Sequence, residues 1–217
     1  MRQAELFAGS RLDHGESLVP GMILYRRYFL AVGQRALAHE IAEVVRQAPW
    51  FTPSMPRSGR PFSVKMTNCG RYGWVSDREG YRYTENHPSC GAPWPPIPHL
   101  ALQAWRNLSD YPHPPEACLV NFYDQDAKMG LHQDRDEAEF AAPILSISLG
   151  CSCAFRYGGL RRGDKTNKLE LHSGDVLVMG GPARLIFHGV DRVFAGSSDL
   201  LAECGRINLT LRRVTLP

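Results

Sequence analysis

From residue 117 to the C-terminus, short runs of strand-forming residues are separated by turn residues. Glycine and aspartate mark the turns, as in the G-G at 158–159 and the S-G-D at 173–175. Many short strands separated in this way are typical of a β-sandwich or a jelly-roll barrel. The pattern predicts a mainly β structure with strands at residues 117–123, 129–134, 144–149, 153–157, 168–172, 176–179, 184–188 and 206–214.

The N-terminal half predicts two helices that would flank this β structure. At residues 34–47, the apolar residues Leu37, Ile41 and Val44 recur on one helical face. The same spacing occurs at residues 96–108, and prolines, which end helices, follow both stretches. Two further short strands are expected at residues 21–25 and 62–67.

The composition of the 217 residues is that of a soluble globular chain, with 43% hydrophobic and 22% charged residues. No apolar run approaches the roughly 20 residues of a membrane-spanning helix. The six cysteines form no C-x-x-C pair, and several lie in apolar runs, which favours reduced thiols over a disulfide framework. We expect a cytoplasmic protein that acts as a monomer.

The segment at residues 50–95 is irregular and rich in basic and aromatic side chains. The net charge of +3 does not by itself indicate a nucleic-acid partner, but six basic residues against two acidic ones lie between positions 55 and 83. Basic groups among aromatic rings suit a phosphate backbone and a stacked base. An irregular surface segment with half-buried aromatics would have the same composition, so both interpretations stay open. The aromatic residues are Tyr72, Trp74, Tyr81 and Tyr83.

A possible metal site lies at the end of the strand expected at residues 129–134. His132 and Asp134 are two positions apart, so in an extended backbone their side chains point to the same face. His188 is the best candidate for a third ligand. Two histidines and one carboxylate form the facial ligand set of non-haem Fe(II) oxygenases. Taken alone, a histidine and an aspartate at this spacing are more often an ordinary surface pair.

The last expected strand has one polar and one apolar face. Arg206, Asn208, Thr210 and Arg212 alternate with apolar residues that must pack on the core. A polar face with two arginines and no acid needs anionic partners, and a guanidinium binds a carboxylate through two hydrogen bonds. With Asn121 and Tyr123, which share one face of another strand, these residues would form a site for a small dicarboxylate.

Several motifs in the chain resemble, in the same order, those of the AlkB family of Fe(II)- and 2-oxoglutarate-dependent dioxygenases, which dealkylate nucleobases directly. The resemblance implies a double-stranded β-helix (jelly roll) with flanking helices and an N-terminal nucleotide-recognition lid. The matching motifs are M-T-N-C-G at 66–70, G-W at 73–74, N-F-Y at 121–123, H-Q-D at 132–134, S-I-S-L-G at 146–150, G-D-V at 174–176, H-G at 188–189 and R-I-N-L-T-L-R at 206–212.

The resemblance also implies an activity. It predicts oxidative demethylation of 1-methyladenine and 3-methylcytosine in DNA and possibly RNA, single- or double-stranded, with release of formaldehyde, succinate and CO2. Fe(II), 2-oxoglutarate and O2 would be required. The alternative is a hydroxylase or demethylase with the same cofactors that acts on tRNA or on a protein side chain, and the basic, aromatic segment argues against the protein side chain.

Each predicted site residue follows from the same resemblance. The chain would be a single catalytic domain of residues 1–217, with the lid at about 50–95 and the jelly-roll core at about 117–214. Arg135 departs from the lysine that bacterial relatives tend to have beside the iron-binding aspartate. The catalytic iron ligands would be His132, Asp134 and His188. The residues holding 2-oxoglutarate would be Asn121, Tyr123, Arg206, Asn208 and Arg212. The substrate would contact Met66, Trp74, Tyr81, Arg135, Asp136 and Arg162, with its base between Trp74 and His132.

Overall fold

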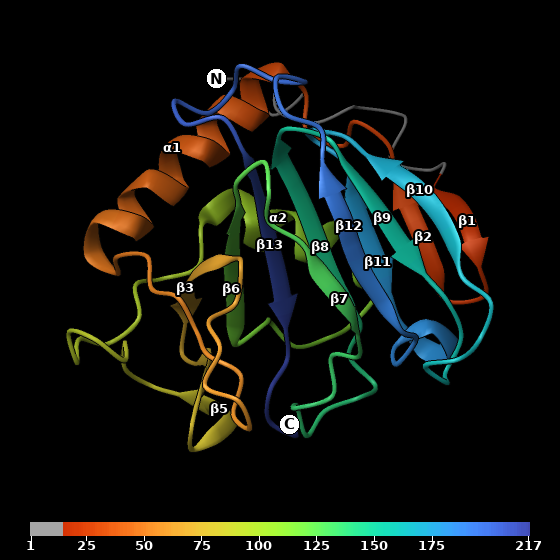
Figure 1. Cartoon of the computed structure of the whole chain (residues 1–217). Coiled ribbons are helices and arrows are strands. Elements are labelled where there is room, and N and C mark those ends of the chain that lie inside the picture. Colours follow the sequence, from red (N-terminus) through yellow and green to blue (C-terminus); the bar gives the residue numbers. More distant parts are fainter. Residues whose placement is uncertain (1–14) are drawn as a thin grey trace.

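Two antiparallel sheets face each other across the middle of the protein (Figure 1). The computed structural model describes residues 15–217. The larger sheet contains, in spatial order, β1 (Glu16–Val19), β2 (Met22–Tyr25), β11 (Val176–Met179), β8 (Ile144–Gly150), β13 (Arg206–Arg212), β6 (Ala117–Tyr123) and β3 (Lys65–Gly70). The smaller sheet contains β10 (Asn167–Leu171), β9 (Cys153–Tyr157), β12 (His188–Val193) and β7 (Met129–His132). This arrangement confirms the predicted mainly β jelly-roll fold.

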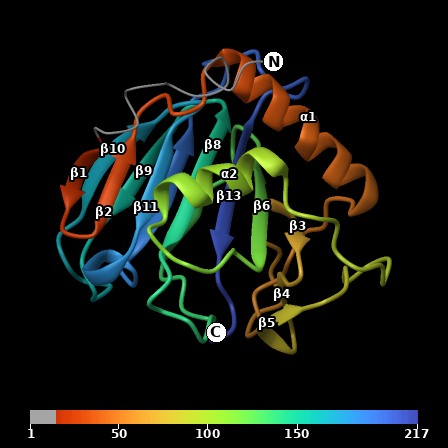
Figure 2. The same ribbon diagram turned by 180° about the vertical axis from the view of Figure 1, so that it is seen from behind.

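Both helices cover the outer face of the larger sheet, as Figure 2 shows for α2 in front of β8, β13 and β6. Helices α1 (Ala31–Gln47) and α2 (His99–Leu108) contribute Leu37, Ile41 and Trp105 to a core shared with the sheet. The two predicted helices are therefore confirmed. Helix α1 begins three residues earlier than expected, while α2 begins only after Pro98, because the prolines before it do not enter the helix.

The strict alternation of side chains in β13 has the predicted consequence. Leu209 and Leu211 pack towards the helices, together with Val120 of β6. The residues between them point the other way, into the space between the sheets, and are buried even though they are polar or charged. The polar face of the last strand is therefore an interior wall and not a solvent-exposed edge.

The strand predicted at residues 184–188 is wrong. Here the chain passes through a short 3-10 helix, η3 (Gly181–Ala183), and β12 begins only at His188. The apolar residues of this segment favoured a strand, but Ile186 is buried without belonging to one. The charged Arg184 is buried as well, with carbonyl and carboxylate partners in another loop.

A small hairpin lies beside the larger sheet at its β3 edge. Strands β4 (Gly73–Asp77) and β5 (Gly80–Thr84) form it, and neither was predicted, nor was β1. The side chain of Asn68 in β3 binds both backbone groups of Trp74, at 3.0 and 3.1 Å, and so fixes the hairpin to the sheet. The strand expected at 62–67 is displaced to 65–70.

No helix within residues 15–217 is long and apolar enough to span a membrane.

Candidate active site

A cavity of about 870 Å³ lies between the two sheets and extends to the β4–β5 hairpin. Its walls contain every residue that the sequence predicted for metal, cosubstrate or substrate. These are Met66, Trp74, Tyr81, Asn121, Tyr123, His132, Asp134, Arg135, Asp136, Arg162, His188, Arg206, Asn208 and Arg212. Residues from distant parts of the chain therefore share one pocket.

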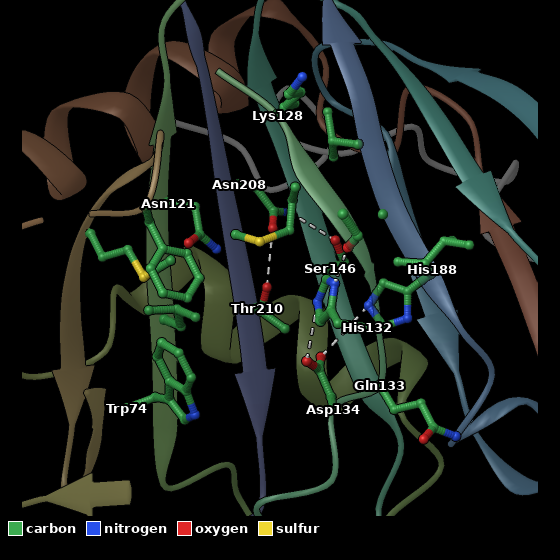
Figure 3. Close-up of a pocket in the computed structure, with 18 of the residues that line it drawn as sticks. Trp74, Asn121, Lys128, His132, Gln133, Asp134, Ser146, His188, Asn208 and Thr210 are labelled. Atoms are coloured by element: carbon green, nitrogen blue, oxygen red, sulfur yellow. Dashed lines mark hydrogen bonds and ion pairs between the residues drawn. The ribbon is translucent and has the colours of Figure 1, made fainter. Parts of the chain in front are cut away.

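His132, Asp134 and His188 point at one another in the middle of the cavity (Figure 3). Strands β7 and β12 pair so that His132 and His188 are direct cross-strand neighbours. Oδ1 of Asp134 lies 3.6 Å from Nε2 of His132, and its Oδ2 lies 3.9 Å from Nε2 of His188. Gln133 points away and donates to the carbonyl of Leu185, so the alternation continues past the end of β7.

Both imidazoles are held with Nε2 towards the centre of this group. Nδ1 of His132 lies 2.9 Å from the carbonyl oxygen of Gly130, and Nδ1 of His188 lies 3.1 Å from that of Ile186. A metal-binding histidine commonly donates its second ring N–H to such a carbonyl. The three ligand atoms lie within 4.8 Å of one another. The donor set and its orientation therefore fit a divalent metal of the Fe(II) type.

The charge states of Asp134 and His188 also suit a metal. Burial would raise the pKa of Asp134, but Arg212 and the two imidazoles outweigh it and hold this pKa below its ordinary value. Burial and the nearby His132 lower the pKa of His188 to about 4. At neutral pH Asp134 is thus an anion and His188 is uncharged, which are the forms that bind metals.

A buried ion-pair network connects this centre to the hairpin. Nη2 of Arg212 lies 2.9 Å from Oδ2 of Asp134, and its Nε lies 3.5 Å from Oε1 of Glu137. Glu137 also accepts hydrogen bonds from Arg184, at 3.0 Å, and from the phenol of Tyr83 in β5. Both arginines and Glu137 are almost fully buried, so each charge depends on these partners.

A second polar group in the cavity has unused hydrogen-bonding capacity. Arg206 is 1% exposed and donates from Nη2 to Ser148 at 2.9 Å, yet its Nε and Nη1 have no hydrogen-bond partner within residues 15–217. Oδ1 of the buried Asn121 is also without one in this part of the chain. Burial raises the pKa of Tyr123 to about 12, so its phenol stays protonated. Unpaired buried donors are costly, and a carboxylate of 2-oxoglutarate would satisfy them.

Asn208 lies on the same wall but already has partners inside the protein. Its Nδ2 donates to Ser146 Oγ at 2.8 Å and to the carbonyl of Ile147 at 3.1 Å. Its Oδ1 accepts a hydrogen bond from Thr210. Asn208 therefore organises the polar floor of the cavity. Thr210, which was expected on the same strand face, belongs to this floor, as does Ser146 of the S-I-S-L-G motif.

Aromatic residues form the hairpin side of the cavity. The rings of Trp74 and Tyr81 are stacked, with centroids 5.5 Å apart and planes inclined by 18°. Nε1 of Trp74 donates to Asp136 at 2.7 Å, which fixes the indole relative to the loop that carries Asp134. Arg162, which also lines the cavity, donates to the carbonyl of Leu131 at 2.8 Å.

The sequence reasoning missed Tyr83, Arg184 and Glu137 as site residues. Tyr83 was noted only as one of several aromatics in a basic segment. Glu137 carries the one available signal, because it lies in the stretch from Asp134 to Glu139, which is rich in acidic residues. Nothing in the sequence shows that a tyrosine and a glutamate 54 positions apart meet in the core.

The family model of the 2OG-Fe(II) oxygenase superfamily matches residues 21–212 of this chain. The fold and the cavity thus define an Fe(II)- and 2-oxoglutarate-dependent dioxygenase, which uses Fe(II), 2-oxoglutarate and O2. A protein of Caulobacter vibrioides (strain NA1000 / CB15N) named alpha-ketoglutarate-dependent dioxygenase AlkB homolog is 50% identical over 197 residues, covering 91% of this chain and 89% of the relative. The chain belongs to the AlkB family.

Two further comparisons agree with this placement. Alpha-ketoglutarate-dependent dioxygenase AlkB of Escherichia coli (strain K12) is 41% identical over 202 residues, covering 91% of this chain and 92% of that protein. The solved structure of OsALKBH1 superposes with a TM-score of 0.75 at 31% identity, covering 92% of this chain and 100% of that one. The resemblance inferred from the motifs is therefore confirmed, and it extends over almost the whole length.

Proposed function

We propose that this enzyme oxidatively demethylates N-alkylated nucleobases. The substrates are 1-methyladenine and 3-methylcytosine in DNA, and RNA that contains these bases is a second candidate substrate. One observation carries the proposal: the aromatic wall of Trp74 and Tyr81 and the ligand group around Asp134 line the same cavity. A planar base stacked on that wall would have its substituents directed towards the ligand group. A relative in Arabidopsis thaliana, 32% identical over 229 residues, is named a DNA N(6)-methyladenine demethylase.

In this proposal His132, Asp134 and His188 hold Fe(II). Arg206 pairs with a carboxylate of 2-oxoglutarate through its unused donors, while Asn121 and Tyr123 contact the same molecule. When bound, the iron with 2-oxoglutarate and O2 supplies the oxidation of the N-methyl carbon, and formaldehyde, succinate and CO2 are the products. The protein itself binds, orients and shields these groups.

The substrate contacts follow from the walls of the cavity. A methyl group on the pairing edge blocks Watson–Crick pairing, so such a base costs less to extrude from a duplex. It usually adds positive charge as well, and a cation is attracted to the face of an indole such as that of Trp74. Asp136, which holds Trp74 by a hydrogen bond, would favour the same cation. Met66 would line the pocket.

Basic residues at the rim would contact the phosphate backbone. Lys128, Arg135 and Arg162 line the cavity and lie in loops, and all three are exposed. Such contacts position a nucleic acid without reading its sequence. A methylated protein side chain would have no use for several cations beside a stacking platform, so these residues favour the nucleic-acid substrate.

We also propose that residues 50–95 act as the nucleotide-recognition lid of a single catalytic domain. The hairpin in this segment carries Trp74 and Tyr81, and Tyr83 connects it through Glu137 and Arg212 to Asp134. All six cysteines are free thiols, which supports the expected cytoplasmic location.

The test is mass spectrometry of methylated oligonucleotides incubated with enzyme, Fe(II), 2-oxoglutarate and ascorbate. DNA and RNA strands, single and duplex, that carry 1-methyladenine or 3-methylcytosine are compared with a methyllysine peptide. Loss of one methyl group from an oligonucleotide supports the proposal. The relative rates of demethylation of the DNA and RNA strands identify the preferred nucleic acid. Demethylation of the peptide alone would reject the proposal.

A further inference from the structure

Two cysteine side chains meet at the end of the larger sheet that carries Arg206. Sγ of Cys151 lies 3.9 Å from Sγ of Cys204. Cys151 follows β8, whereas Cys204 belongs to the loop between β12 and β13, so 53 positions in the sequence separate them. The proposed catalytic machinery uses neither thiol.

The two thiols differ in their surroundings. Cys204 is exposed to solvent, while Cys151 is 2% exposed. Burial would raise the pKa of Cys151, but hydrogen bonds from Cys204 and from the turn at Gly196 and Ser197 outweigh it, and this pKa lies below its ordinary value. Two sulfur atoms in contact, one open to solvent and the other with a lowered pKa, can form a disulfide through a sulfenic acid.

We propose that Cys151 and Cys204 are an oxidation site that a hydroperoxide converts reversibly into a disulfide. The thiol sulfur of Cys204 attacks one peroxide oxygen and its proton passes to the other; the O–O bond breaks, water leaves, and Cys204 becomes a sulfenic acid. The Cys151 thiolate then attacks this sulfur, the S–S bond forms, and the S–O bond breaks to release hydroxide. In total the two thiols lose two electrons and two protons, and hydrogen peroxide is reduced to two waters.

Closing this disulfide would disturb the backbone that leads to Arg206. The sulfur atoms must approach from 3.9 Å to about 2.05 Å. Between Cys204 and Arg206 lies only Gly205, whose carbonyl accepts the N–H of Cys151 at 2.8 Å. A Cβ at Gly205 would lie 2.7 Å from the ring of Phe122. This segment is therefore tightly packed and has little room to move.

The functional consequence rests on the proposed role of Arg206. A shifted guanidinium would lose part of a charge-assisted pair with 2-oxoglutarate. We expect 2-oxoglutarate to bind on the order of tenfold more weakly to the oxidised protein. Reduction of the disulfide should restore the affinity.

Other cysteines provide internal controls. Cys69 and Cys118 are cross-strand neighbours in β3 and β6, but both are fully buried, so hydrogen peroxide should leave them reduced. Cys90 is exposed, and the Cys90→Ser variant should behave as the wild type. Cys204→Ser should form no disulfide, and Cys153→Ser should still form it, which excludes Cys153 as the partner of Cys204.

The experiment treats the full chain, freed of iron by a chelator, with one equivalent of hydrogen peroxide and alkylates the remaining thiols. Peptide mass spectrometry should find Cys151 and Cys204 linked, and dithiothreitol should separate them. Separate alkylation of both, or a link to another cysteine, overturns the proposed site. A link that leaves 2-oxoglutarate affinity unchanged after reloading with Fe(II) overturns its effect on Arg206. If the reduced protein binds no 2-oxoglutarate, the proposed function fails instead, while the peptide map still decides the disulfide.

Discussion

Nη2 of Arg212 lies 2.9 Å from Oδ2 of Asp134, deep in the cavity. The same guanidinium lies beside Glu137, which accepts a hydrogen bond from Tyr83 of the hairpin. One arginine thus contacts a proposed iron ligand and, through a buried carboxylate, the segment that carries the aromatic wall. The aromatic wall on which a base would stack is therefore connected by direct contacts to the proposed metal ligand Asp134.

Replacing Arg212 by lysine should lower turnover on the order of tenfold, although the charge is kept. A lysine ammonium is a point charge and cannot contact two carboxylates with the fixed geometry of a guanidinium. The measurement is formaldehyde release at saturating 2-oxoglutarate. Arg192→Lys, at an exposed position of β12, is the matched control and should keep wild-type turnover. Equal turnover of both variants would contradict the bridging role.

Arg206→Ala should raise the KM for 2-oxoglutarate strongly and leave oligonucleotide binding nearly intact. The loss of a partly buried pair with a carboxylate costs roughly 2–5 kcal/mol. The structural reason is that two guanidinium nitrogens of Arg206 are buried without a partner among residues 15–217. The measurement is initial rate against 2-oxoglutarate concentration, with oligonucleotide affinity determined in parallel. An unchanged KM would rule out this assignment.

Trp74→Ala should reduce kcat/KM for a methylated oligonucleotide on the order of tenfold or more. Stacking of a base on an aromatic side chain is worth about 1–3 kcal/mol. The affinity for 2-oxoglutarate should stay normal, because Trp74 lies on the hairpin side of the cavity. Tyr72→Ala changes a neighbouring aromatic that does not line the cavity and serves as the control. If both variants demethylate like the wild type, Trp74 is not the stacking platform.

Glu116→Gln should destabilise the protein at neutral pH by roughly 1.5–3 kcal/mol, because the carboxylate accepts hydrogen bonds from the backbone of Val214 and Thr215. Despite burial, these bonds and Arg213 hold the pKa of Glu116 below its ordinary value of 4.5. The stabilisation is therefore present above that value and is lost as the pH falls through the lower pKa of the folded state.

Urea unfolding at neutral pH and below pH 4.5 checks this prediction. The difference between wild type and Glu116→Gln should shrink in acid. Glu43→Gln alters an exposed carboxylate on α1 and should leave the free energy of unfolding close to that of the wild type at both pH values. A difference that persists unchanged in acid would show that Glu116 stabilises by packing and not by its charge.

The fold could be predicted from the sequence because its signals are local. Turn residues delimit the strands, and the alternation from Arg206 to Arg212 identifies a wall with one apolar face. The position of His132 next to His188 could only be inferred from the ligand set and the family motifs, since it depends on the register of β7 and β12.

What the sequence could not predict depends on contacts between distant segments. The hairpin around Trp74 has no clear strand pattern, and it is fixed by the amide of Asn68 in the neighbouring strand. Arg184 was assigned to a strand because its neighbours are apolar, whereas its burial requires the carboxylate of Glu137 from another loop. Side-chain contacts between distant segments produce no periodic pattern in the sequence of either segment.

In the proposed function, the ligand group around Asp134 and the cavity beside it demethylate a nucleobase. The most direct measurement is formaldehyde and succinate released from an oligonucleotide that carries a single 1-methyladenine, for the wild type and for Asp134→Ala in metal-controlled buffer. We predict equal amounts of both products from the wild type, only with Fe(II) and 2-oxoglutarate present, and none from the variant. Formaldehyde at the wild-type rate from Asp134→Ala, or none from the wild type on this base and on 3-methylcytosine, would contradict the account.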